Sequence, residues 1–129
     1  MNRIGLLKRA LRETPDADPQ LVIDLRALED SVRAVQVALN GDRTARRRNE
    51  PTPSSLRTRL GRFTGGAWSG SLSEVTGMQR QQYDIVTAQF GAILERLRRA
   101  IDVDLERIEE AAEAAGAPWT SGRVPSWRP

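Results

Sequence analysis

Two runs of apolar residues at helical spacing constrain the fold of this chain most. In residues 18–40 the apolar positions step by four and three residues through three heptads: Leu21, Leu25, Leu28, Val32, Val35 and Leu39. A second stripe of the same kind runs from Tyr83 to Ala112. Steps of three and four place side chains on one face of an α-helix, and a sustained seam packs along a partner helix. The sequence therefore predicts an all-α fold in which two long helices pack as an antiparallel pair.

Capping signals mark the ends of both helices. Asp18 before Pro19 is a typical helix start, and Asn40-Gly41 is a typical stop. Thr76 with Gln79 matches a capping box, while Gly116 and Pro118 follow the end of the second stripe. We expect helices over 18–40 and 76–115, with Gly91 as the one point where the second helix bends or closely approaches a neighbour.

Shorter segments fill the rest of the chain. Residues 3–12 predict a short amphipathic helix, and Ser55 is placed to cap another over 56–63. The sequence thus divides into a short amphipathic helix at 1–14, a helical hairpin domain at 15–117 and an extended tail with Pro and Trp at 118–129. The hairpin domain contains a loop-rich connector, 42–75, that we expect to be mobile.

The antiparallel arrangement also predicts a register. Placing Leu39 near Tyr83 brings Leu28 near Leu94, and Leu21 near Ile101. The last turns of the second helix then extend past the first helix and need cover. We expect Ile4, Leu7 and Leu11 to supply it, with the basic side chains of the same segment facing the acidic residues between 102 and 113.

Composition excludes most catalytic and metal chemistry. The 129 residues include no Cys and no His, so thiolate or imidazole metal sites and the Ser-His-Asp arrangement are not available. Six carboxylates crowd residues 102–113, but the inward positions there are Leu105, Ile108 and Ala112. We expect no catalytic, cofactor-binding or metal site and hence no enzyme.

The apolar runs are three or four residues long, too short for a membrane span, and residues 1–14 lack the features of a signal peptide. We therefore expect neither a membrane span nor a signal peptide, and the sequence does not indicate the compartment.

Two sets of residues are candidates for contacts with partners. Apolar side chains outside the two-helix seam favour a protein partner, either a second copy or a larger protein; they are Val22, Ile23, Val37, Ile85, Ile93 and Val103, joined by Trp119 in the tail. Residues 41–63 carry seven arginines against Asp42 and Glu50. A solvated connector is the favoured interpretation of this segment, and the alternative is a helical protein that binds nucleic acid phosphates through Arg43, Arg46, Arg47 and Arg48.

The order of these features resembles a known architecture. The heptad helix, Asn40-Gly41-Asp42, the capping box with Tyr83, and above all the stretch from Gly116 to Pro125 (GAPWTSGRVP) carry the resemblance. Residues 18–125 resemble the C-terminal helical region of large bacterial proteins built from sortilin-like, BNR-repeat β-propellers, which are often labelled glycosyl hydrolase or sialidase-like.

The chain departs from that family because it has no propeller and lacks the Ser-x-Asp-x-Gly-x-x-Trp box of BNR repeats. No catalytic residue carries over. The resemblance implies a non-catalytic structural or interaction module, an accessory piece that docks on a β-propeller domain or on another chain.

Overall fold

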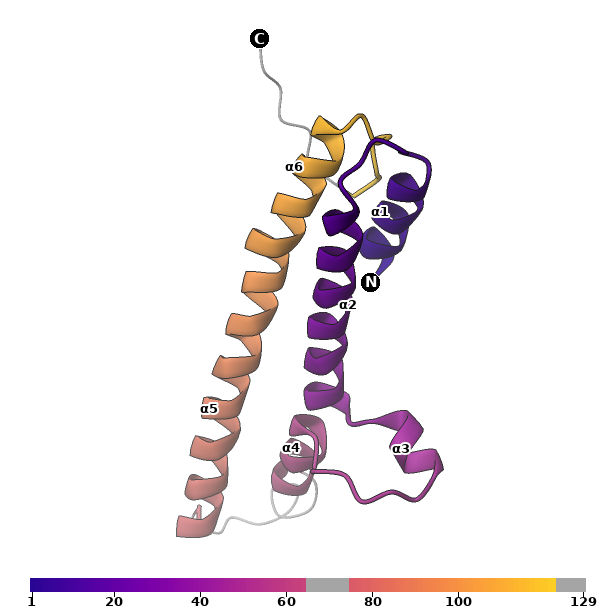
Figure 1. Ribbon diagram of the computed structural model, residues 1–129. Helices are drawn as coiled ribbons and strands as arrows, with labels where there is room; N and C mark the ends of the chain where they lie inside the picture. The colour runs from indigo at the N-terminus through magenta and orange to yellow at the C-terminus, as the bar shows by residue number, and fades with distance from the viewer. Residues whose placement is uncertain (65–74, 123–129) are drawn as a thin grey trace. The chain divides into compact units, whose positions relative to one another are not determined.

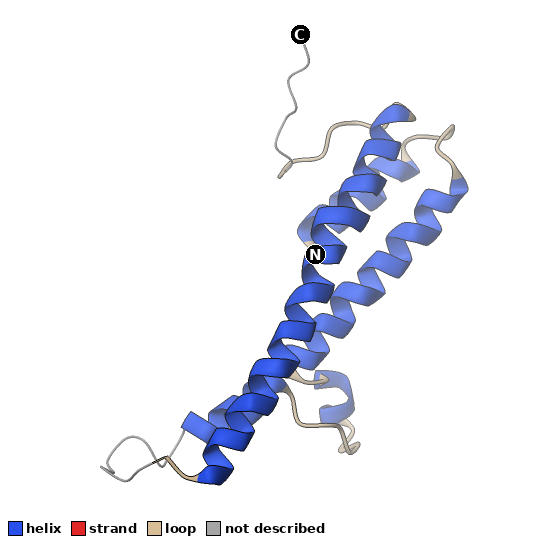
Figure 2. Ribbon diagram, turned by 90° about the vertical axis from the view of Figure 1, so that its left-hand side faces the viewer, coloured by secondary structure: helices blue, strands red, loops and turns tan. Residues whose placement is uncertain are grey.

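A computed structural model describes residues 1–64 and 75–122, which form helices and loops with no strand among them (Figures 1 and 2). The all-α prediction is confirmed. In chain order the helices are α1 (Asn2–Arg12), α2 (Pro19–Asn40), α3 (Arg43–Arg47), α4 (Leu56–Thr64), α5 (Gly77–Arg99), the π-helical segment η1 (Ala100–Leu105) and α6 (Glu106–Ala114).

The chain divides into two compact units. One combines Met1–Val32 with Arg98–Pro129, and the other is Arg33–Leu97. The long helices α2 and α5 each contribute to both units. Residues 1–14 share the first unit with the start of α2 and with α6.

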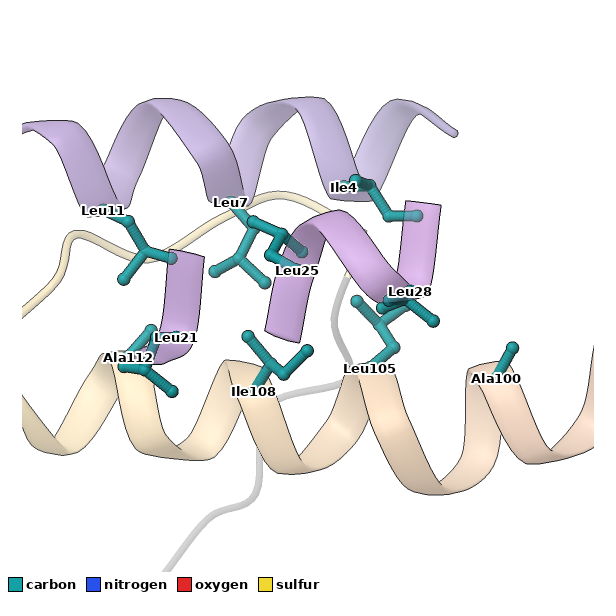
Figure 3. Close-up of a cluster of buried hydrophobic side chains, with 10 residues drawn as sticks. All are labelled: Ile4, Leu7, Leu11, Leu21, Leu25, Leu28, Ala100, Leu105, Ile108 and Ala112. Atoms are coloured by element: carbon teal, nitrogen blue, oxygen red, sulfur yellow. The ribbon is translucent and has the colours of Figure 1, made fainter. Parts of the chain in front are cut away.

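The first unit is built around a three-helix core. Ile4, Leu7 and Leu11 of α1 are buried together with Leu21, Leu25 and Leu28 of α2 and with Ala100, Leu105, Ile108 and Ala112 of η1 and α6. Figure 3 shows the side chains of α1 and of η1–α6 pointing toward one another, with the α2 leucines among them. The expected cover of Ile108 by α1 is therefore present. Ile108 itself is fully buried.

The predicted register of the long helices is wrong in this unit. Leu28 belongs to the same buried cluster as Leu105, whereas Leu94 is half-buried and lies outside the cluster. Ile101, the expected partner of Leu21, is exposed. The pairing is displaced by about three helical turns along the second helix. The displacement arises because α1 supplies a third apolar face, so the core forms around three helices rather than between two.

The π-helical segment η1 explains why Ile101 lies outside the core. Successive core positions on this helix are Ala100 and Leu105, a step of five residues. A π-turn closes its hydrogen bonds over five residues, so such a step keeps both side chains on the buried face. The stripe read from the sequence assumed steps of three and four and placed Ile101 there. Among the described residues, no atom lies within 4 Å of the position of a Cβ at Gly91, so no close approach of a neighbour is present there.

The helix ends follow the local signals. Asp18 accepts a hydrogen bond from the Gln20 amide at 2.8 Å, and the Ser55 hydroxyl accepts one from the Thr58 amide at 3.2 Å. The capping box is present: the Thr76 amide donates to Gln79 Oε1 at 2.8 Å, and the Gln79 amide donates to Thr76 Oγ1 at 3.2 Å. These starts were predicted because caps depend on neighbouring residues only.

The connector and the start of the tail contain elements that the sequence did not specify. Residues 43–47 form α3, and α4 extends to Thr64, so the connector 42–75 is not loop-rich throughout; its residues 65–74 lie outside the described part. Ala117, just before the predicted tail, packs against the core of the first unit. Within the tail Thr120 is buried, whereas Trp119 is exposed. Residues 121–122 form a turn, and the extended structure expected for 123–129 falls on residues that are not described.

Candidate functional site

The exposed apolar side chains of the second unit are the most prominent candidate for a binding surface. None of the 23 residues of α5 is buried, although the helix carries Tyr83, Val86, Phe90 and Leu94 in its apolar stripe. Tyr83 is 58% exposed and Phe90 is 49% exposed. Within the described residues of this unit, the buried apolar side chains are Val35, Ala45 and Leu56. The apolar face of α5 is therefore only partly covered.

The predicted partner contacts have unequal exposure. Ile23, Val103 and Trp119 are more than half exposed, and Val22 and Val37 are each 40% exposed. Ile85 and Ile93, both on α5, are half-buried. They therefore expose less apolar surface than the other predicted contacts.

These candidates are divided between the two units. Val22, Ile23, Val103 and Trp119 belong to the first unit, whereas Val37, Ile85 and Ile93 belong to the second. Sequence reasoning missed Tyr83 and Phe90 because it assigned both to the buried seam.

Glu109 and Arg107, at the end of the long helix, form ion pairs with neighbouring helices. The Arg3 guanidinium of α1 donates two hydrogen bonds to the carboxylate of Glu109, at 3.2 and 2.7 Å, and the Glu109 side chain is 3% exposed. Arg107 pairs with Asp24 of α2 at 2.9 Å. A hydrogen bond from Gln20, followed by the one from Arg107, lowers the pKa of Asp24.

Glu109 is the acidic residue that the sequence did not distinguish from its neighbours. The expected ion pairing of α1 with this end of the helix is present for Arg3, whereas Lys8 pairs with Glu29 of α2. Among the described residues no three acidic side chains are grouped so as to hold a metal ion.

The stretch from Ala117 to Gly122 is held against the first unit by short-range contacts. The Ala117 amide donates a hydrogen bond to the Ala112 carbonyl at 2.9 Å. Gly122 has a φ of +93°, and a Cβ added to it would lie 3.4 Å from Cγ of Arg3. The buried Thr120 hydroxyl has no hydrogen-bond partner in the described part of the chain. Trp119, which is 51% exposed, thus lies between residues that contact the first unit.

Three of the four candidate arginines lie in α3, a helix that the sequence did not predict, and the fourth, Arg48, directly follows it. Asp42 caps this helix by accepting hydrogen bonds from the amides of Thr44 at 2.8 Å and Ala45 at 3.1 Å. These bonds, the one from Ala45 first, hold the pKa of Asp42 below its ordinary value. All four candidate arginines are exposed, and Arg48 pairs with Glu50 at 2.7 Å.

Comparisons with known proteins do not assign a family. No family model, no curated protein and no solved structure matches this chain. In the described residues no helix is long and apolar enough to cross a membrane.

Proposed function

We propose that this protein is a non-catalytic helical interaction module that docks against a larger protein through the apolar face of α5. The observation that carries the proposal is that no side chain of this 23-residue helix is fully buried, while Tyr83 and Phe90 are about half exposed. An amphipathic helix in water gains most of its stability by burying its apolar face. A partner that covers α5 would supply that burial.

The gain from such cover is large enough to support binding. Tyr and Phe side chains each bury about 150–250 Å² when fully covered, so the exposed halves of Tyr83 and Phe90 offer roughly 75–125 Å² each. At about 25 cal/mol per Å², their burial contributes about 4–6 kcal/mol before the costs of association. Aromatic side chains are enriched among the residues that dominate binding energy at protein interfaces.

The resemblance to propeller-associated helical regions suggests the class of partner. The residues that carry it most specifically, Gly116 to Pro125, include Trp119, which is 51% exposed beside the buried Thr120. An exposed Trp suits insertion into a pocket on a partner, because Trp is enriched among the residues that dominate binding energy at protein interfaces. We propose a β-propeller domain as the partner, with a second copy of this chain as the competing occupant.

Site-specific photocrosslinking on the full chain tests the proposal. A benzophenone amino acid at position 90 should crosslink to the partner when the chain is mixed with a purified BNR-repeat propeller protein. The matched control is position 88, which is also exposed on α5 but lies about 160° away around the helix. Crosslinking from position 90 alone supports the proposal.

Two results would overturn it. Equal crosslinking from positions 88 and 90 would mean that contact is not directed by the apolar face. A chain that remains monomeric in light scattering, binds no apolar dye and crosslinks to nothing from position 90 would show that α5 needs no cover.

A further inference from the structure

The four candidate arginines, Arg43, Arg46, Arg47 and Arg48, fall into two groups relative to α3. Arg43, Arg46 and Arg47 stand at positions i, i+3 and i+4 of the helix, a spacing that places three side chains on one face. Ala45 lies on the opposite side of the helix and is buried. Arg48 follows the helix and pairs with Glu50. The structure therefore selects three arginines, which we term the α3 arginine face.

The backbone that holds this face is fixed at both ends. Asp42 caps the first turn, and Asn49, at a φ of +54°, ends the helix where the Glu50 amide donates to the Ala45 carbonyl at 3.0 Å. Gly41, at a φ of +85°, precedes the cap, and a Cβ there would lie 2.9 Å from the Arg46 guanidinium. The helix is short, but its caps and the burial of Ala45 set the direction in which the arginines project.

The three charges are close together and have no counterion in the described chain. All three side chains are exposed, and none forms a salt bridge with any residue of 1–64 or 75–122. Five helical residues span about 6 Å along the axis, so three cations occupy one short face. Like charges three and four residues apart on a helix are destabilising. An anionic partner removes that repulsion.

We propose that the α3 arginine face binds the phosphate backbone of double-stranded nucleic acid without reading its sequence. A duplex carries one phosphate per about 3.4 Å of its axis on each strand, so several phosphates lie within reach of three long arginine side chains on a face of this length. Guanidinium groups bind phosphate through paired hydrogen bonds.

The composition of the face distinguishes this partner from an acidic protein. Stable protein interfaces have an apolar centre, whereas nucleic acid interfaces are polar and strongly positive. The face offers Arg43, Arg46 and Arg47 with Thr44 exposed beside them, and its one apolar residue, Ala45, is buried. No aromatic side chain occurs in α3, so base stacking of the kind used for single strands is not available there.

Fluorescence anisotropy with a labelled 20-base-pair duplex of mixed sequence tests the proposal on the full chain. The dissociation constant is measured across a salt series for the wild type and for the triple variant Arg43→Ala, Arg46→Ala and Arg47→Ala. The matched control changes Arg9, Arg12 and Arg26 to Ala, three exposed arginines of the first unit, and so alters the net charge equally.

The expected result is salt-dependent binding that the α3 variant loses selectively. Each phosphate contact contributes about −0.9 to the slope of log affinity against log salt, so removing three should reduce its magnitude by about 2.7. Affinity at low salt should fall about tenfold or more in the α3 variant and much less in the control. Circular dichroism spectra should coincide, because the cap and Ala45 are unchanged.

Three outcomes would overturn the proposal. They are no binding at low salt, equal losses in the two triple variants, or polyglutamate of equal charge competing as well as the duplex. The last outcome would assign the face to acidic polypeptides. None of these outcomes bears on the apolar face of α5, so the two proposals fail independently.

Discussion

Truncation of Ile108, compared with truncation of Ile101, tests the three-helix core and the π-helical step together. Ile108 is fully buried, while Ile101 is 42% exposed. Ile108→Ala removes three carbons, which loses about 2.4 kcal/mol of transfer free energy at about 0.8 kcal/mol per carbon. The cavity left in a core shared by three helices adds to this loss, and the total should fall within about 2–5 kcal/mol.

Ile101→Ala should lower the free energy of unfolding by about 1 kcal/mol or less, since much of its side chain already contacts water. Urea unfolding followed by far-ultraviolet circular dichroism measures both, and the denaturant slope shows whether the variants unfold from the same compact state. A reciprocal variant sharpens the comparison. Ala100 is 3% exposed, so Ala100→Leu should overpack the core and cost about 1–3 kcal/mol.

The opposite ranking would refute the reasoning. If the helix ran through residues 100–105 without a π-step, Ile101 would face the core and Ala100 would lie beside solvent. Ile101→Ala would then destabilise the protein as much as Ile108→Ala, and Ala100→Leu would be nearly neutral. Equal small effects at all three positions would mean that this core is not formed.

Three further predictions concern the ion pairs and the caps. Arg3→Ala should lower the free energy of unfolding by about 2–3 kcal/mol because Glu109 stays buried, whereas Lys8→Ala should cost under about 1 kcal/mol; equal urea midpoints would contradict this. Thr76→Ala should destabilise the start of α5 by about 0.5–2 kcal/mol, seen as faster hydrogen exchange of its first amides, and unchanged exchange would contradict it. Since folding lowers the pKa of Asp42, its contribution to stability is present above the ordinary Asp pKa and is lost as pH falls through the lowered value; an NMR titration midpoint at the ordinary value would contradict this.

The helix starts could be predicted from the sequence because they depend on local chemistry. Asp18 and Ser55 each cap the backbone two or three residues ahead, and the Thr76 box closes within one turn. Residues this close in the chain contact one another whatever the rest of the molecule does. The amphipathic segment at residues 3–12 was also predictable, since its apolar face is set by spacing alone.

The register could not be predicted because it depends on a choice among apolar faces. The stripe from Tyr83 to Ala112 offers Ala100 and Ile101 as neighbouring candidates for the core, and steps of three and four favour Ile101. The structure instead buries Ala100, which the π-turn places on the core face. Ala100 is small, whereas α1 and α2 contribute large side chains to the same core. Whether Ala100 or Ile101 enters the core depends on how η1 packs against α1 and α2, which are distant from it in the sequence.

The α3 helix had a local signal that was outweighed by composition. Asp42 accepts hydrogen bonds from amides two and three residues ahead, as a helix cap does, but the surrounding Arg, Pro and Ser residues favoured a loop. Once the helix is recognised, the i, i+3 and i+4 positions separate Arg43, Arg46 and Arg47 from Arg48. The candidate phosphate contacts are therefore the three arginines on one face of α3, and no longer include the adjacent Arg48.

Binding through the apolar face of α5 and binding through the α3 arginine face should respond oppositely to added salt. A salt series on one sample can therefore distinguish the two contributions. Contacts of Tyr83 and Phe90 bury apolar area, so excluded salts such as sulfate leave them intact or strengthen them. Contacts of Arg43, Arg46 and Arg47 with phosphates weaken steeply as salt displaces them. If one partner used both surfaces, raising the salt would remove the electrostatic part of its affinity and leave an apolar remainder. The size of that remainder, measured in the α3 triple variant, gives the contribution of α5 without disturbing its helix.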